Sequence, residues 1–133
     1  MLYVEDDAAS LALVEALIAG RKDLVLLCAA DIEFAMKLAR HERPEVIMVN
    51  VDLAALAGVP LMKILRADPA TQATPVLALG ANAAPQAAVR SLEAGFFLYL
   101  AKPPQAGPLL EALDYALEFG ALERAEQSLK ESP

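Results

Sequence analysis

Short apolar segments alternate along the chain with longer segments in which apolar residues recur every three or four positions. Uninterrupted apolar runs of this kind are typical of strands that are buried on both faces. They cover residues 2–4, 24–29, 46–50, 75–80 and 96–100. The segments between them have helical periodicity, which predicts helices over residues 11–18, 31–43, 61–65, 85–95 and 108–117.

Residues that favour helix ends support these boundaries. Asp31 stands where an N-cap is needed and Pro85 where a helix begins, while Gly20 and Pro44 follow predicted helix ends. Five strands that alternate with five helices predict an α/β fold with a parallel sheet and helices on both faces. For one domain of this length we expect a flavodoxin-like (βα)5 three-layer sandwich with strand order 2-1-3-4-5.

This strand order brings the chain segments after several strands to one edge of the sheet, where α/β proteins place their ligand sites. The segments that follow residues 2–4 and 46–50 become neighbours there. Because Asn50 is an uncharged amide at the end of a buried strand, it is an unusual residue for such an edge. The polar residues and turns expected at this edge are Glu5, Asp6, Asp7, Asn50 to Asp52, Gly80 and Lys102.

The adjacent carboxylates of the motif VEDD are the most informative feature of the edge. Neighbouring carboxylates repel each other unless they are solvated or hold a cation. Carboxylate and carbonyl oxygens are the ligands that Mg²⁺ prefers. An exposed acidic turn that caps the first helix is the alternative, and the pair gains weight only because Asn50 and Lys102 share its edge.

Four segments, in this order and spacing, resemble the receiver domain of two-component response regulators over residues 2 to about 118: LYVEDD, RPEVIMVN, LRADPATQATPVLALGANA and AGFFLYLAKP. The resemblance implies a strand aspartate that takes a phosphoryl group from a histidine kinase. It also implies an acidic pair that binds Mg²⁺ with the acceptor, a serine or threonine and a lysine that contact the phosphoryl oxygens, and an aromatic switch residue.

The motif of the family places most of these roles on residues of this chain. Asp6 and Asp7 match the acidic pair, and the backbone carbonyl of Asp52 matches a further metal contact. Lys102, which precedes a proline, matches the lysine, and Tyr99 matches the switch aromatic.

Two positions depart from the family pattern. The acceptor position falls on Asn50, whose amide is a poor nucleophile and cannot form an acyl phosphate. The hydroxyl position falls on Gly80, which has no hydroxyl. The loss of one charge at Asn50 should also weaken the metal site, so we expect Mg²⁺ at Asp6, Asp7 and Asp52 to bind weakly or not at all. We expect no other cofactor and predict a non-enzymatic pseudo-receiver.

The roles of three further side chains stay open. Tyr99 is either a switch residue or an amphipathic cover of the sheet edge with its hydroxyl in water. Lys102 is expected to pair with Asp6 or Asp7 and to neutralise the edge without a metal. Asp52 is interpreted as a solvated turn residue, and the alternative is that it serves as a substitute phosphoacceptor.

Composition narrows the partners and the location. The net charge is −7 and there is no basic patch, so we expect no direct contact with nucleic acid. The apolar runs are too short to span a bilayer, and we expect no membrane contact and a cytoplasmic location. The acidic turn after the first strand argues against a flavodoxin-like flavin binder, because a flavin phosphate needs a turn rich in N–H groups.

We divide the chain into a receiver-like domain over residues 1–119 and a helical extension or linker over residues 120–133, where Gly120 interrupts the helical pattern. The expected partner is a histidine kinase or an output domain. A homodimer is a further hypothesis, either through the surface of the helix at 85–95, the strand at 96–100 and the last helix, or through the extension. An active receiver that is phosphorylated at Asp52 is the alternative function.

Overall fold

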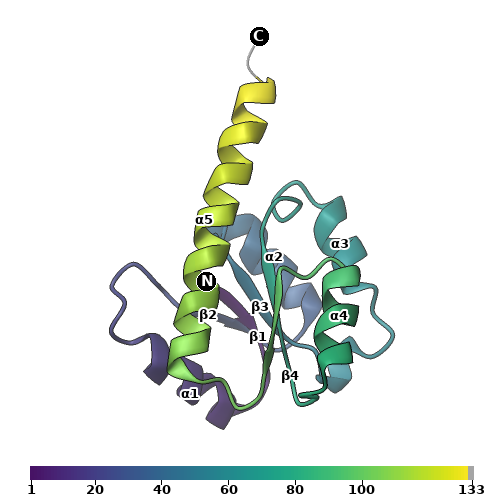
Figure 1. The fold of residues 1–133 in the computed structure, drawn as a ribbon. Coiled ribbons are helices and arrows are strands. Elements are labelled where there is room, and N and C mark those ends of the chain that lie inside the picture. Colours follow the sequence, from purple (N-terminus) through teal and green to yellow (C-terminus); the bar gives the residue numbers. More distant parts are fainter. Residues whose placement is uncertain (132–133) are drawn as a thin grey trace.

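A computed structural model describes residues 1–131, which form one parallel five-stranded sheet with helices on both faces (Figure 1). The strand order is β2-β1-β3-β4-β5, and all pairs are parallel, which confirms the predicted flavodoxin-like topology. The strands are β1 (Leu2–Val4), β2 (Leu27–Ala29), β3 (Ile47–Asn50), β4 (Val76–Gly80) and β5 (Leu98–Ala101). The helices are α1 (Ala8–Ile18), α2 (Ile32–Glu42), α3 (Leu61–Ala67), α4 (Pro85–Glu93) and α5 (Ala106–Glu131), with a 3-10 turn η1 (Ala54–Leu56).

Side chains of the central strands alternate between two cores. Ile47 and Val49 of β3 join the core beneath α2 and α3, whereas Met48 joins the core beneath α1 and α5. The helix α4 lies on the same side as α3 (Figure 1). Because both faces of the sheet are covered, its central strands are continuously apolar, as the sequence pattern indicated.

Aspartates define the beginnings of two helices. Asp31 accepts a hydrogen bond of 2.8 Å from the Phe34 N–H at the start of α2, which confirms the predicted N-cap. Asp7 caps α1 in the same way, through the N–H of Ser10 at 2.9 Å. At the end of α2, Arg43 takes a left-handed conformation directly before Pro44.

The last helix continues through Gly120 instead of stopping there. A Cβ at this position would lie 3.2 Å from the Pro75 side chain, so glycine lets α5 pass close to the start of β4. Beyond Gly120 the helix projects from the body of the domain (Figure 1). The predicted extension is therefore the second half of α5, and residues 132–133 of that prediction lie outside the described residues.

Candidate functional site

The carboxyl ends of β1 and β3 meet in a buried hydrogen-bonded pair. The Asn50 Nδ2 atom donates to both carboxylate oxygens of Glu5, at 3.0 and 2.9 Å. Glu5 is only 2% exposed and Asn50 only 6%. The register explains the pairing: Tyr3 lies opposite Met48, and Glu5 and Asn50 each follow two residues later on the same face. The amide therefore compensates a carboxylate that is shielded from water.

Two further donors complete the surroundings of the Glu5 carboxylate. The Tyr3 hydroxyl donates to one oxygen at 3.2 Å, and the Asp6 N–H donates to the other at 3.0 Å. Burial, followed by the charge of Glu5, raises the pKa of Tyr3 well above its usual range, so the phenol stays a proton donor. Within the described chain, the hydrogen bonds to the buried carboxylate thus come from uncharged groups.

The other end of the Asn50 side chain positions Asp52. The Asn50 Oδ1 atom accepts the N–H of Asp52 at 3.0 Å, which closes a short turn after β3. From this turn, the Asp52 Oδ2 atom accepts the Ala81 N–H at 2.7 Å and lies 3.1 Å from the Lys102 ammonium. The hydrogen bond from Ala81, and then the one from Lys102, lower the pKa of Asp52.

The expected pairing of Lys102 with Asp6 or Asp7 is wrong, because Asp52 is the carboxylate that binds the lysine. Asp52 does lie in the turn after β3 with 46% of its side chain exposed, which agrees with its interpretation as a solvated turn residue, but it also has partners within the chain. Asp52 holds the lysine because the turn after β3 carries its carboxylate across to the ends of β4 and β5. Asp7 instead accepts the N–H and the hydroxyl of Ser10 on the first turn of α1. The serine contacts lower the pKa of Asp7, so this carboxylate remains charged as a cap.

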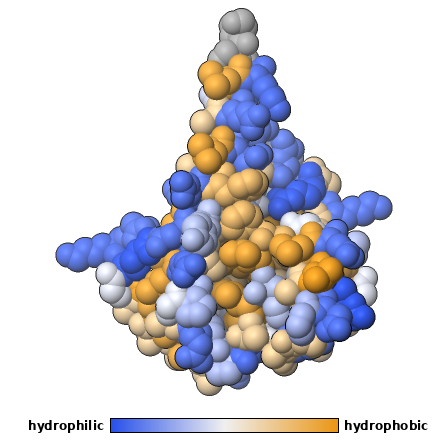
Figure 2. Space-filling view, viewed as in Figure 1, coloured by the Kyte–Doolittle hydropathy of each residue, from blue (hydrophilic) through white to orange (hydrophobic). Residues whose placement is uncertain are grey.

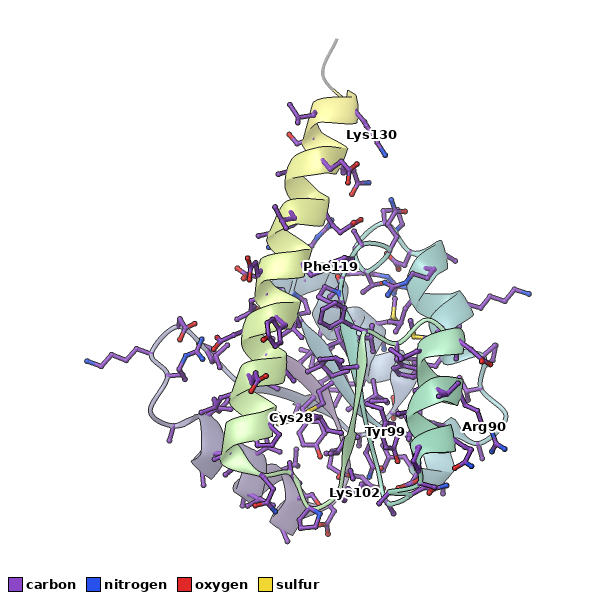
Figure 3. All side chains as sticks on the ribbon, in the orientation of Figure 1. Cys28, Arg90, Tyr99, Lys102, Phe119 and Lys130 are labelled. Carbon is purple, nitrogen blue, oxygen red and sulfur yellow. The ribbon has the colours of Figure 1, made fainter. Side chains whose placement is uncertain are left out.

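Tyr99 points into the same edge and not simply into water. Its hydroxyl donates to the backbone carbonyl of Asn82 at 2.6 Å, in the connection between β4 and α4. Burial, and then the charge of Asp52, raise the pKa of Tyr99. Gly80 lies directly against the phenol ring. Figure 3 shows Lys102 at this end of the domain, opposite the end from which Lys130 projects.

Three of the carboxylates at this edge already have partners within the described chain. The Glu5 carboxylate is surrounded by neutral donors, Asp7 caps a helix, and Asp52 faces a lysine. Among residues 1–131, no three or more His, Cys, Asp or Glu side chains converge in a way that could hold a metal. A cation that prefers several carboxylate and carbonyl oxygens would have to displace these contacts first.

Sequence reasoning placed Glu5 at this edge but gave it no role. Its role follows from the strand order together with the register of β1 and β3, which the structure supplies. Residues two apart in an extended strand share a face, so Glu5 lies on the Tyr3 side and Asn50 on the Met48 side. Because β1 and β3 are neighbours, the carboxylate and the amide had to meet.

Comparison with known proteins assigns the family. The family model described as "Response regulator receiver domain" matches residues 1–114. The chain therefore belongs to this family, the receiver domains of two-component systems, which are in general signalling modules rather than enzymes.

A curated relative and two solved structures give the degree of similarity. The sensory/regulatory protein RpfC of Xanthomonas campestris pv. campestris is 30% identical over 117 residues, which are 85% of this chain and 16% of that protein. A putative response regulator from Chloroflexus aurantiacus has a TM-score of 0.78 and 29% identity, over 88% of this chain and 95% of that one. The receiver domain of sensor histidine kinase PA1611 from Pseudomonas aeruginosa, solved with magnesium in its active-site cleft, has a TM-score of 0.74 and 28% identity over the same shares.

The length of this chain limits what the relatives imply. It spans about a sixth of RpfC, so the similarity concerns one receiver domain and not the other activities of that protein. Within residues 1–131, no helix has the combined length and hydropathy that a membrane span requires.

The buried pair predicts the effect of a carboxylate at position 50. In Asn50→Asp, two carboxylates would share one buried site, and we expect a loss of unfolding free energy on the order of 2 kcal/mol at neutral pH without divalent cations. Like charges raise the pKa of one carboxyl, so the loss is smallest in acid and grows as the pH rises through that raised pKa. Urea unfolding across pH, with and without Mg²⁺, measures it, and Mg²⁺ is expected to recover part of the loss.

The exposed asparagine of the chain supplies the control. Asn82→Asp makes the same change of charge at the surface and is expected to alter stability by less than about 0.5 kcal/mol. If Asn50→Asp is as stable as the unchanged protein in the absence of divalent cations, the amide does not compensate Glu5 as described.

Proposed function

We propose that this chain is a receiver domain that takes no phosphoryl group at Asn50 and acts through protein–protein contacts. The observation that carries the proposal is the engagement of Asn50. Its amide nitrogen is committed to Glu5 and its amide oxygen to the N–H of Asp52. An amide in this position offers neither a nucleophilic oxygen nor a charge for a metal ion.

Mg²⁺ binding in this proposal is weak at most. The relative with magnesium in its cleft supports the idea that the fold can hold the ion at this edge. In this chain the corresponding edge is occupied by contacts among its own residues, with Lys102 already beside Asp52. The Lys102 ammonium already supplies the positive charge that a bound cation would otherwise bring to the Asp52 carboxylate.

An exposed apolar surface supports a contact function. Leu92 of α4 and Phe119 of α5 line one groove with Phe97, whose ring lies 5.0 Å from that of Phe119. Figure 2 shows apolar surface between α4 and α5 and along the projecting part of α5. We propose that this face meets the partner, a histidine kinase or an output domain, in the cytoplasm.

Asp52 gives the second candidate function a specific basis. Its side chain is 46% exposed and lies 3.1 Å from Lys102, so a carboxylate and a lysine do stand together at this edge. Against it, the carboxylate oxygen near the lysine already accepts the Ala81 N–H. A receiver that is phosphorylated at Asp52 is therefore the rival hypothesis.

Intact-mass measurement distinguishes the two. The unchanged protein, Asn50→Asp and Asp52→Asn are each incubated with Mg²⁺ and a small acyl phosphate. We expect no gain of a phosphoryl group on the unchanged protein, because neither amide atom of Asn50 is a competent nucleophile. Asn50→Asp shows whether the remaining site is still competent for phosphoryl transfer.

A stable phosphoryl group on the unchanged protein would contradict the proposal. If the unchanged protein gains the phosphoryl group and Asp52→Asn does not, phosphorylation at Asp52 replaces our proposal. If both proteins gain the group, a different residue is the acceptor and both hypotheses fail.

We also propose that the projecting part of α5 brings two copies of the chain together. Tyr115, Leu122 and Leu129 follow one another at intervals of seven residues, the spacing of one coiled-coil position. Leu122 is 65% exposed and Leu129 is 77% exposed. A pair of helices that meet along this line would remove these leucines from water.

Sedimentation tests the self-association. The full chain is expected to gain mass with concentration, whereas a chain that ends at Phe119 is expected to stay monomeric. The full-length variant with Leu122→Ser and Leu129→Ser separates the effect of the leucines from that of chain length, and Ala121→Ser is its matched control. Equal masses for all four proteins at every concentration would rule out this contact.

A further inference from the structure

The connection between β4 and α4 is held by side chains from two other parts of the chain. The Ala81 N–H donates to the Asp52 carboxylate at 2.7 Å, and the same carboxylate oxygen binds Lys102 at 3.1 Å. One residue further on, the carbonyl of Asn82 accepts the Tyr99 hydroxyl at 2.6 Å. The turn after β3 is thus bonded to Ala81, and the strand β5 is bonded to the next residue of the connection, Asn82.

The Tyr99 ring has room in this position only because residue 80 is a glycine. A Cβ at Gly80 would lie 2.5 Å from the Tyr99 hydroxyl oxygen and 3.1 Å from the Cε2 atom of the ring. It would also lie 3.0 Å from the Val51 side chain. Gly80 has no positive φ, so the requirement is one of space and not of backbone conformation. Any side chain at this position would push the phenol away from Asn82.

The backbone of Asp52 is itself held in place by the buried pair of Asn50 and Glu5. Its N–H is bonded to Asn50, and Asn50 is bonded to the buried carboxylate of Glu5. Within the described chain, Asp52 therefore has an anchored backbone on one side and a cation with an N–H donor on the other. This arrangement places the negative charge of a carboxylate at the point where β3, β4 and β5 end.

The helix α4 is the element that this arrangement controls. None of its residues, Pro85–Glu93, is buried, so its own side chains anchor it weakly. Its position relies on the connection that precedes it and on β5, which is its main packing partner. Leu92 of α4, which is exposed, is part of the apolar surface described above.

We propose that Asp52 is a built-in anion that holds Ala81, and through this connection Tyr99, in one position, so that the α4–β5 surface has a fixed form without any phosphoryl group. The proposal rests on the proposed function, in which Asn50 is not phosphorylated. It adds that the contact surface is set by residues of the chain itself. Gly80 is then required for this arrangement of Asp52, Ala81 and Tyr99, and is not merely a position at which the hydroxyl of the family is missing.

Nuclear magnetic resonance on the full chain can test both contacts, the one between Asp52 and Ala81 and the one between Tyr99 and Asn82. Protein labelled with nitrogen-15 reports the Ala81 amide, and fluorotyrosine reports Tyr99, which is one of three tyrosines and is assigned with Tyr99→Phe. The variants are Asp52→Ala, which removes the anion, and Gly80→Ala, which fills the space of the ring. Gly20→Ala is the matched control, because a Cβ there would meet no heavy atom of the described chain within 4 Å.

We expect Asp52→Ala to shift the Ala81 amide upfield and to move the fluorine signal of Tyr99 as well. Gly80→Ala should move the Tyr99 signal to that of a solvent-exposed phenol, while Gly20→Ala leaves both signals unchanged. A Tyr99 signal that stays at its original position in Asp52→Ala would overturn the proposal, and this holds even if Gly80→Ala fails to fold.

The same samples separate this proposal from the proposed function. With Mg²⁺ and a small acyl phosphate, both signals of the unchanged protein should stay in place. If the mass of the protein shows phosphorylation, the proposed function fails, and the built-in anion that rests on it fails as well. If no phosphoryl group is gained but Asp52→Ala leaves Tyr99 in place, only the built-in anion fails.

Discussion

A buried carboxylate that has only neutral hydrogen-bond donors around it sets the character of this domain. Glu5 sits at the end of β1 with almost no contact with water, and the amide of Asn50 is its main partner from another strand. Burying a charge without such donors would cost several kcal/mol. The residue at position 50 therefore has to be a donor, and a second carboxylate there would need a cation or a proton between the two groups.

From this pair, a chain of contacts crosses the carboxyl edge of the sheet. Asn50 fixes the turn that carries Asp52, and Asp52 binds both Lys102 and the backbone after β4. Tyr99 then closes over Gly80 onto the same connection. In a receiver domain this edge is where phosphoryl chemistry is expected. Here it is filled by hydrogen bonds and one ion pair among residues of the chain.

Sequence patterns predicted the architecture well, because continuous apolar runs and helical periodicity report burial directly. The strand order, the N-cap at Asp31 and the beginning of α4 at Pro85 were all predictable from the sequence. The site was predicted only in part. Residue types indicated an acidic edge with an amide at position 50, but they did not show which carboxylate would face it.

The remaining details depend on directions of side chains that no motif encodes. Asp7 caps α1, and it is the half-exposed Asp52, not Asp6 or Asp7, that pairs with Lys102. Gly120 was expected to interrupt the last helix because glycine weakens helices, yet the close approach to Pro75 makes a glycine useful there. The partner of Asp52 and the place of Gly120 are decided by tertiary contacts between residues far apart in the sequence, whereas the Asp7 cap is a contact with Ser10 in the next turn of the chain.

The side-chain amide of Asn50 is the most direct probe of this arrangement. The chain has two asparagines, Asn50 and Asn82, so selective labelling with nitrogen-15 asparagine gives two side-chain amide signals. The buried pair predicts that the Asn50 protons exchange with water far more slowly than those of the exposed Asn82, and that Mg²⁺ with an acyl phosphate leaves them unchanged. Equal exchange rates, or a shift of the Asn50 signal on that addition, would contradict a site closed by Asn50 and Glu5.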